Sequence, residues 1–223
     1  MVGELLVTAR FEGVVMAETA TAIHDIGAVR KAKAGEVHRL AAVLARAFYD
    51  DPPTRWVFPA DSRRVSQLDR SFALYLRKLW FAQDECYTTD GIAGAAIWES
   101  PGKWQTSVFQ QLRLAPALLA INGRFFPRLL QTITVLESNH PKELHYYLPF
   151  VGVDPELQGR GIGSALLRPI LDRCDREGVP AYLEASTPGN RALYERHGFV
   201  VTEEFVLGKG SPPLWRMWRK PAS

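Results

Sequence analysis

The period of the apolar positions changes along the chain and divides it into helices and strands. Residues 35–48 and 61–81 carry apolar side chains every three to four positions, which predicts two amphipathic helices that each pack one face on a sheet. Residues 26–33 alternate weakly and indicate a first strand. Residues 85–100 contain two strand-like runs around Asp90-Gly91, a favoured two-residue turn, so we expect a hairpin.

Two regions interrupt or complicate this pattern in the first part of the chain. In the segment YDDPPTRW, the proline pair removes backbone donors and restricts the preceding residue, so we expect a loop between the two helices. Residues 100–141 have a mostly helical pattern, which we expect to be broken at Pro116, Gly123 and Pro127.

The second part of the chain alternates between strands and helices. A helical pattern over 162–178 contains Pro169, which predicts a local distortion. The run VPAYLEAS is typical of a strand, and Thr187-Pro188 is typical of the start of a short helix. Residues 200–221 then predict a closing antiparallel hairpin.

The run YYLPFVGV, residues 146–153, is almost continuously apolar, as in a strand that is buried on both faces. Pro149 lies inside this run and cannot donate a hydrogen bond to a neighbouring strand. We therefore expect a bulge or a splayed neighbour at this point. Such a gap leaves backbone groups with which an extended ligand that contains amides can pair.

A glycine-rich turn, Gln158-Gly159-Arg160-Gly161-Ile162-Gly163, stands between this strand and the next helix. Glycines allow successive backbone N–H groups to point inward, and the helix N-terminus adds a partial positive charge, so a phosphate or pyrophosphate fits here. The turn has no Lys-Ser/Thr pair of a P-loop, and its glycine spacing differs from the dinucleotide-binding pattern.

The composition sets limits on partners and on location. The chain has 223 residues and is 47% hydrophobic, so we expect one domain over 26–223 after an N-terminal extension, 1–25. The 27 basic and 24 acidic residues give a net charge of only +3, which offers no reason to expect a nucleic-acid partner. No apolar run reaches the roughly 20 residues that span a bilayer, and the start is a poor signal peptide, so we expect no membrane partner and a cytoplasmic location.

The cysteines and histidines point to no disulfide and no metal. Cys86 and Cys174 lie far apart in apolar segments, which fits two reduced, buried thiols. The five histidines have no spacing typical of metal ligands, so we expect no metal cofactor.

The central residues resemble the GNAT superfamily of N-acetyltransferases. Gln158, Gly161 and Gly163 match its glycine motif between strand and helix, and Asn190 with Tyr194 match its short helix before a Gly-Phe pair. The resemblance implies an α/β fold whose central, mostly antiparallel sheet of about seven strands splays in a V and is flanked by helices. It also implies acetyl-CoA as co-substrate.

The resemblance implies a set of cofactor-binding residues. The pantetheine amides would pair with backbone of the central strand, and the pyrophosphate would meet the N–H groups of the turn. Asn190 would hold the pantetheine arm or the start of its helix. The full set is Phe150, Val151, Val153, Gln158, Gly159, Arg160, Gly161, Ile162, Gly163, Ser164 and Asn190.

The resemblance also implies catalytic roles. Tyr194 matches the tyrosine that protonates the leaving thiolate, for which the phenol and thiol pKa values are close enough. Glu184 is our first candidate for the general base that takes the proton of the amine, although a carboxylate in an apolar strand also needs a structural partner. His145 is a second candidate, against the alternative of an ordinary residue at a strand edge.

Aromatic and acidic side chains on loops and strand ends suit a cationic amine as acceptor. The candidates for the acceptor site are Tyr49, Asp50, Asp51, Trp56, Trp98, Glu99 and Trp104. We expect acetylation of a small-molecule amine, such as an antibiotic or an amine metabolite. Two alternatives stay open: a protein lysine or N-terminus as acceptor, and a non-catalytic domain that senses acyl-CoA. The sequence leaves open whether the protein is a monomer or a homodimer.

Overall fold

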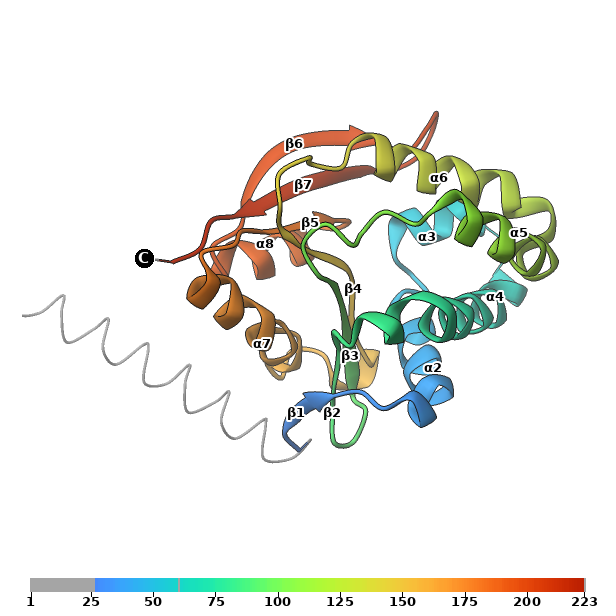
Figure 1. Cartoon of the computed structure of the whole chain (residues 1–223). Helices are drawn as coiled ribbons and strands as arrows, with labels where there is room; N and C mark the ends of the chain where they lie inside the picture. Colours follow the sequence, from blue (N-terminus) through green and yellow to red (C-terminus); the bar gives the residue numbers. More distant parts are fainter. Residues whose placement is uncertain (1–26, 60, 223) are drawn as a thin grey trace, which may run out of the picture.

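A seven-stranded sheet runs through the middle of the molecule in the computed structural model, which describes residues 27–59 and 61–222 (Figure 1). The expected extension over 1–25 lies outside the described residues. The strands, in their order across the sheet, are β1 (Val29–Lys31), β2 (Cys86–Thr89), β3 (Gly94–Glu99), β4 (Tyr146–Val153), β5 (Ala181–Ala185), β7 (Pro213–Arg219) and β6 (Val200–Val206). The β4–β5 pair is parallel, and the other pairs in the described sheet are antiparallel. The predicted fold is confirmed.

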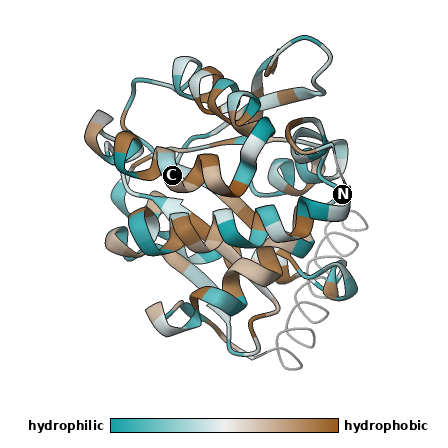
Figure 2. Cartoon of the chain, turned by 90° about the vertical axis from the view of Figure 1, so that its right-hand side faces the viewer, coloured by the Kyte–Doolittle hydropathy of each residue, from teal (hydrophilic) through white to brown (hydrophobic). Residues whose placement is uncertain are grey.

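Helices cover both faces of the sheet (Figure 1). One face carries α7 (Ile162–Glu177), and α8 (Pro188–Arg196) lies next to β5. The other face carries α2 (Val37–Ala47), α3 (Pro52–Val57), α4 (Asp61–Tyr75), α5 (Val108–Asn122) and α6 (Phe126–Ser138). Figure 2 views the molecule from the side of this second group, where hydrophobic and hydrophilic residues alternate along the helices. No helix in the described part of the chain is long and apolar enough to cross a membrane.

The two faces of the sheet bury two separate cores. Leu166, Leu167 and Ile170 of α7 are fully buried against one face. Leu40 and Leu44 of α2 are fully buried against the other. Each such side chain contributes about 1.5–3 kcal/mol through burial alone, so α2 and α7 hold the sheet firmly from both sides.

Pro149 marks the place where the sheet opens. Between the pairs Ile97↔Phe150 and Glu99↔Tyr147, β4 contains one residue more than β3, which is a bulge at the proline. The pairing of β4 with β5 ends at Leu148↔Leu183, so from Pro149 onward the edge of β4 that faces β5 has no partner among the described strands. The gap predicted from Pro149 is confirmed.

Two local predictions about turns were wrong. The hairpin between β2 and β3 exists, but its last pair is Thr88↔Ala95, so the turn is longer than Asp90-Gly91. Ile92 takes a left-handed φ of 58°, and the Thr89 hydroxyl accepts a hydrogen bond from the Ala93 N–H at 2.9 Å, which fixes the longer turn.

The segment YDDPPTRW forms the short helix α3 instead of a loop. Its prolines stand in the first turn, where a helix needs no donor, and the Asp51 carboxylate caps it by accepting from the Thr54 N–H at 3.2 Å.

Pro116 also does not break α5, because it lies on the exposed side, where water can hydrogen-bond the carbonyl left without a partner. Pro169 likewise lies inside a continuous α7.

Candidate active site

The glycine-rich turn forms one wall of a cavity of about 1540 Å³. Gly159 and Gly161 have φ values of 78° and 77°, which favour glycine, and Gly161 is the N-cap of α7. The first N–H groups of α7 have no partner within the helix and lie at its positive end. The wall of the cavity can therefore bind a phosphate group.

Most residues predicted to bind the cofactor line this cavity. They are Val151, Val153, Gln158, Gly159, Arg160, Gly161, Ile162, Gly163, Ser164 and Asn190. Phe150 does not, because its ring packs against Phe48, Phe72 and Trp80 at 5.1–5.4 Å between ring centroids. For Phe150, we therefore retain only the prediction that its backbone contacts the cofactor.

Tyr194 on α8 also lines the cavity. Its side chain is buried and packs edge-to-face against Phe199 at 6.0 Å. Burial, together with the negative charge of Asp51, raises the pKa of the Tyr194 phenol. The phenol therefore stays protonated at neutral pH, as a general acid requires.

Asn190 and Asp51 meet at Ser186, just after β5. The Asn190 side-chain amide donates to the Ser186 hydroxyl at 3.2 Å, and its backbone N–H donates to the Thr187 hydroxyl at 3.1 Å. Burial raises the pKa of Asp51, against hydrogen bonds from Ser186 and Thr54 that lower it. Asn190 thus fixes the start of α8, while Asp51 connects α3 to the same point.

Of the seven acceptor candidates, Tyr49, Asp50 and Asp51 line the cavity with the cofactor residues. Asp51 also has a structural role that a local pattern indicates, because an aspartate directly before Pro52 is typical of an N-cap. Because we expected a loop here, the capping role of Asp51 was missed.

Trp98 and Trp56 do not line the cavity, and we withdraw both as substrate residues of it. Trp98 is fully buried in the core beneath α7, because its position on β3 points to that face of the sheet. Trp56 packs under the Arg128 guanidinium at 5.4 Å, and its carbonyl accepts a hydrogen bond from Arg128 at 2.9 Å.

Glu184 lies outside the cavity, in a buried network on the opposite face of the sheet from α7. Its carboxylate accepts hydrogen bonds from the Tyr182 and Tyr147 phenols at 2.7 and 2.9 Å. Burial raises the pKa of Glu184 to about 7, although both phenols oppose the shift. A carboxyl group with this pKa can exchange a proton near neutral pH.

The alternative to a catalytic role for His145 was an ordinary position at a strand edge, and the structure does not show such a position. His145 is buried, its Nδ1 lies 2.6 Å from the Glu143 carbonyl, and its Nε2 lies 2.9 Å from Nε2 of His140. Trp104 stacks on His140 at 3.7 Å between ring centroids. Burial lowers the pKa of His145, so this aromatic cluster holds a neutral imidazole.

Cys86 and Cys174 are free and buried, and burial raises the pKa of both thiols to about 12. Neither is therefore a nucleophile at neutral pH. Over residues 27–59 and 61–222, no group of three or more His, Cys, Asp or Glu side chains is arranged to hold a metal ion.

Comparisons with known proteins agree with this geometry. Residues 98–199 match the acetyltransferase (GNAT) family. The chain is 29% identical to an uncharacterized N-acetyltransferase of Schizosaccharomyces pombe, over 87% of this chain and 83% of that protein.

Two crystal structures have a similar fold. One, from Corynebacterium glutamicum, is described as histone acetyltransferase HPA2 and related acetyltransferase; the TM-score is 0.67 at 26% identity, over 88% of this chain and 97% of that one. The other is arylalkylamine N-acetyltransferase 2 of Aedes aegypti, with a TM-score of 0.53 at 12% identity, over 87% of this chain and 98% of that one. At this identity the second shows the fold alone.

The splayed sheet, the glycine-rich turn and the family match together define an enzyme that transfers acetyl groups. The match to the GNAT family covers just under half of the chain, residues 98–199, and over most of its length the chain is similar to acetyltransferases of this type. Enzymes of this type act on amine acceptors, so the alternative of a non-catalytic sensor domain is set aside.

Proposed function

We propose that the protein transfers the acetyl group of acetyl-CoA to the primary amine of a small molecule. The observation that carries this proposal is the shared cavity in which the glycine-rich turn, the open edge of β4 and Tyr194 meet. The cavity thus contains both a phosphate site and a proton donor.

The residues present fit acetyl-CoA. The N–H groups from Gln158 to Ser164 suit the pyrophosphate, and Arg160 can add a charge-assisted contact. The backbone of Phe150, Val151 and Val153 runs along the unpaired edge of β4, where the pantetheine amides can pair as another strand would. When bound, acetyl-CoA supplies the thioester that reacts.

The reaction forms one C–N bond and breaks one C–S bond. The nitrogen of the neutral amine attacks the thioester carbonyl carbon, and the sulfur leaves as a thiolate. Tyr194 gives its proton to this sulfur, since its phenol is held in the protonated form next to the cavity. The amine must first lose a proton, and Glu184 accepts it, because its pKa of about 7 suits that exchange.

The aromatic side chains near the opening of the sheet favour a small acceptor over a protein acceptor. Phe72, Tyr75, Trp80 and Phe150 form a continuous aromatic group there, with ring centroids 5.1–6.5 Å apart. Phe72 and Trp80 are buried, whereas Tyr75 and Phe150 keep some exposed surface, and aromatic rings of this kind suit a small amphipathic amine through apolar and cation–π contacts. A lysine presented by a folded protein would need an open groove instead.

The choice of particular amines to test as acceptors comes from the sequence. The segments VPAYLEASTPGNRALYERHGFVVT and WRMWRKP resemble puromycin N-acetyltransferase, so puromycin and other amine antibiotics belong among the acceptors to be tested.

The test is release of free thiol from acetyl-CoA in the presence of a panel of amines. The panel contains puromycin, aryl-alkyl amines, polyamines, and peptides with a lysine or a free N-terminus. We expect turnover with at least one small amine and none with the peptides. Turnover with the peptides alone would overturn the choice of acceptor, and acetyl-CoA binding without thiol release for any compound would overturn the reaction.

The role of Tyr194 is tested by Tyr194→Phe. Loss of the proton donor should lower kcat about 10²–10⁴-fold with little change in the KM for acetyl-CoA. Tyr146→Phe is the matched control, because Tyr146 lies in the same core as Tyr194, but its phenol hydrogen-bonds Glu177 at 2.8 Å and does not line the cavity. Unchanged kcat in Tyr194→Phe would remove the phenol from the mechanism.

A further inference from the structure

Three neighbouring strands bring two glutamates to the same face of the sheet, where it opens. Glu99 on β3 pairs with Tyr147 on β4, and Tyr147 pairs with Tyr182 on β5. Glu184 lies two residues beyond Tyr182, just past the last β4–β5 pair, Leu148↔Leu183. The two carboxyl groups therefore stand on either side of β4 at the point where the thioester must react if the proposed function holds.

The two carboxyl groups are coupled electrostatically. Glu99 accepts a hydrogen bond from the Trp80 indole at 3.1 Å and is 8% exposed. Burial, reinforced by the charge of Glu184, raises the pKa of Glu99 to about 8. Two buried carboxylates do not both ionise readily next to each other, so the pair holds at least one proton near neutral pH.

Other charged and titratable groups face the pair without neutralising it. Arg216 on β7 pairs opposite Glu184, yet its guanidinium also binds Glu203 at 2.6 Å. His140 packs edge-on against the Tyr147 and Tyr182 rings at 4.6 and 5.0 Å. Burial lowers the pKa of His140 to about 3, so it stays neutral. The pair therefore retains its affinity for a cation.

The second, independent observation lies on the helices above this face. The side-chain oxygens of Gln67 and Ser71 on α4 and of Asn122 on α5 are buried, yet they have no hydrogen-bond partner among the described residues. These residues are only 7%, 9% and 1% exposed. An unsatisfied buried polar group costs about 1–3 kcal/mol, so three of them together indicate the place of a missing partner.

The chemistry of this missing partner follows from the groups that are already bonded. The Gln67 amide N–H reaches the Asn122 carbonyl at 3.5 Å, and the Asn122 amide N–H donates to the Leu118 carbonyl at 2.8 Å. Both amides have thus used a donor and kept a free acceptor oxygen. A ligand that completes the site must bring N–H or O–H donors.

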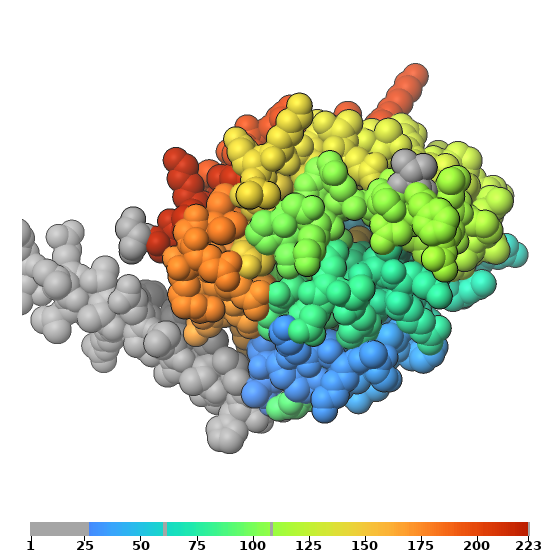
Figure 3. Space-filling model, in the orientation of Figure 1, coloured from blue at the N-terminus to red at the C-terminus, as the bar shows by residue number. Residues whose placement is uncertain are grey.

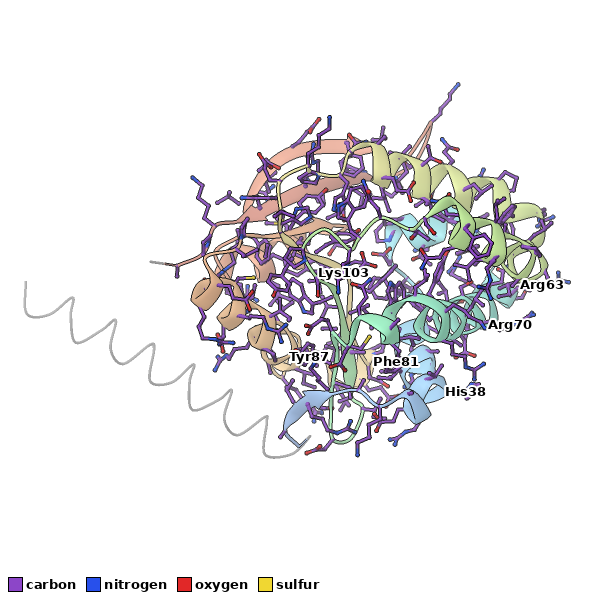
Figure 4. All side chains as sticks on the ribbon, viewed as in Figure 1. His38, Arg63, Arg70, Phe81, Tyr87 and Lys103 are labelled. Carbon is purple, nitrogen blue, oxygen red and sulfur yellow. The ribbon has the colours of Figure 1, made fainter. Side chains whose placement is uncertain are left out.

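The polar oxygens and the acid pair are connected along one helix. Gln67, Ser71 and Tyr75 follow one another at four-residue intervals and so lie along one side of α4. Tyr75 stacks on Trp80 at 5.3 Å between ring centroids, and Trp80 binds Glu99. Arg63 and Arg70, labelled in Figure 4, are exposed on the outer side of the same helix. The polar side of α4 therefore leads inward to Glu99.

The cover over this face is thin. In Figure 3 a small opening is visible between α4, α5 and the segment that follows β3. None of the described residues of α6 is buried, and α5 leaves Phe109 and Leu112 each 67% exposed. Tyr75, Tyr147 and Glu184 keep some accessible surface beneath this cover. A small molecule can thus approach from the side opposite the glycine-rich turn.

We propose that this face is the acceptor site and that it selects a particular class of primary amine. Glu99 and Glu184 bind the ammonium group, Tyr75, Trp80 and Phe150 contact an apolar middle, and the oxygens of Gln67, Ser71 and Asn122 accept hydrogen bonds from N–H or O–H groups at the far end. The proposal rests on the proposed function and specifies its substrate.

The protons balance in this scheme. The bound ammonium gives one proton to Glu184, and the resulting neutral amine attacks the thioester. The second proton leaves the nitrogen for water as the C–N bond forms, and water returns one proton to Tyr194 after its phenol has protonated the departing sulfur. Overall, one ammonium and acetyl-CoA yield an amide, CoA with a free thiol, and one proton that Glu184 returns to water.

The first test is Glu99→Gln, which keeps the shape of the side chain and removes its ability to ionise when the ammonium group binds. The KM for the amine should rise about 10–100-fold, the loss expected for a hydrogen bond to a charged group, while the KM for acetyl-CoA stays unchanged. Glu177→Gln is the matched control, because Glu177 also accepts a tyrosine phenol but lies on the other face of the sheet. It should leave both constants unchanged.

The second test addresses the far end with phenylethylamine and its para-hydroxylated analogue. The unaltered protein should prefer the hydroxylated amine about 5–10-fold in kcat/KM, and Ser71→Ala should abolish this preference. Thermal unfolding of each variant checks that it is folded.

The outcomes separate the two proposals. If no amine releases thiol, the proposed function fails. If small amines are acetylated but Glu99→Gln leaves their KM unchanged, or changes the KM for acetyl-CoA equally, the acceptor site assigned to this face is wrong. If Ser71→Ala keeps the preference for the hydroxyl group, the α4–α5 oxygens do not contact the substrate.

Discussion

At the scale of single residues, the cavity is organised by two groups that interact without sharing an element. Tyr194 comes from α8, and Asp51 caps α3, yet the Asp51 charge adds to the effect of burial in raising the pKa of the Tyr194 phenol. A negative charge near an acid makes loss of its proton less favourable. Asp51 is thus a positioning residue that keeps Tyr194 in its protonated form over a wider pH range.

Asp51→Asn tests this effect, because asparagine caps a helix about as well as aspartate and so keeps α3 stable. Without the negative charge the pKa of Tyr194 falls, so the alkaline fall of kcat should begin at lower pH than in the unaltered protein. The measurement is kcat against pH at saturating amine and acetyl-CoA. Asp50→Asn, which changes the exposed neighbour, should leave the profile in place, and an unmoved profile in Asp51→Asn would refute the coupling.

At the scale of elements, the glycine-rich turn and α7 form one unit whose geometry depends on glycine at Gly161. Its φ of 77° is the left-handed conformation, which costs other residues about 1–2 kcal/mol. The N–H groups that follow it face the cavity. A strained replacement would shift these donors by tenths of an ångström, which matters more for an anion than for packing.

Gly161→Ala should therefore raise the KM for acetyl-CoA and lower the free energy of unfolding by about 1–2 kcal/mol. Gly178→Ala is a close control, since Gly178 ends the same helix with a φ of 67° and lies away from the cavity. Both variants should unfold at similar denaturant concentrations, and only Gly161→Ala should bind acetyl-CoA more weakly. Equal binding by the two would show that the turn does not hold the pyrophosphate.

The elements also show what sequence reasoning can reach. Periodicity located the strands and helices of the sheet, and Pro149 located its opening, because the absence of a backbone donor is a property of one residue. The longer β2–β3 turn was not predicted, because Ile92 adopts a left-handed φ that its residue type disfavours. The sequence did not predict that Glu99 and Glu184 lie near each other. Their proximity depends on the register of three strands, which no local pattern encodes.

At the scale of the whole molecule, the sheet separates two approaches to one point. The cavity with the glycine-rich turn reaches Tyr194 from one side, and the acid pair with the α4 oxygens lies on the other side of the opening at Pro149. Two substrates can thus meet at the splayed strands without competing for the same surface. The same arrangement buries carboxyl groups in the centre of the fold, and this has a consequence for stability.

Glu99 should make the protein less stable as the pH rises. Its pKa is about 8 in the folded protein and near 4.5 when unfolded, so between these values the folded state binds more protons than the unfolded state. The stability that this proton contributes is fully present below pH 4.5 and is lost as the pH rises through 8. Glu99→Gln carries a neutral group at every pH and removes this loss.

Chemical denaturation at pH 5.5 and 8.5 measures the difference. We expect the unaltered protein to lose on the order of 3 kcal/mol more than Glu99→Gln between these two pH values, since each pKa unit of difference corresponds to about 1.4 kcal/mol. Glu177→Gln should follow the unaltered protein. If Glu99→Gln showed the same pH dependence as the unaltered protein, Glu99 would be ionised in the folded state at neutral pH, and the acid pair would bind an ammonium group without giving up a shared proton.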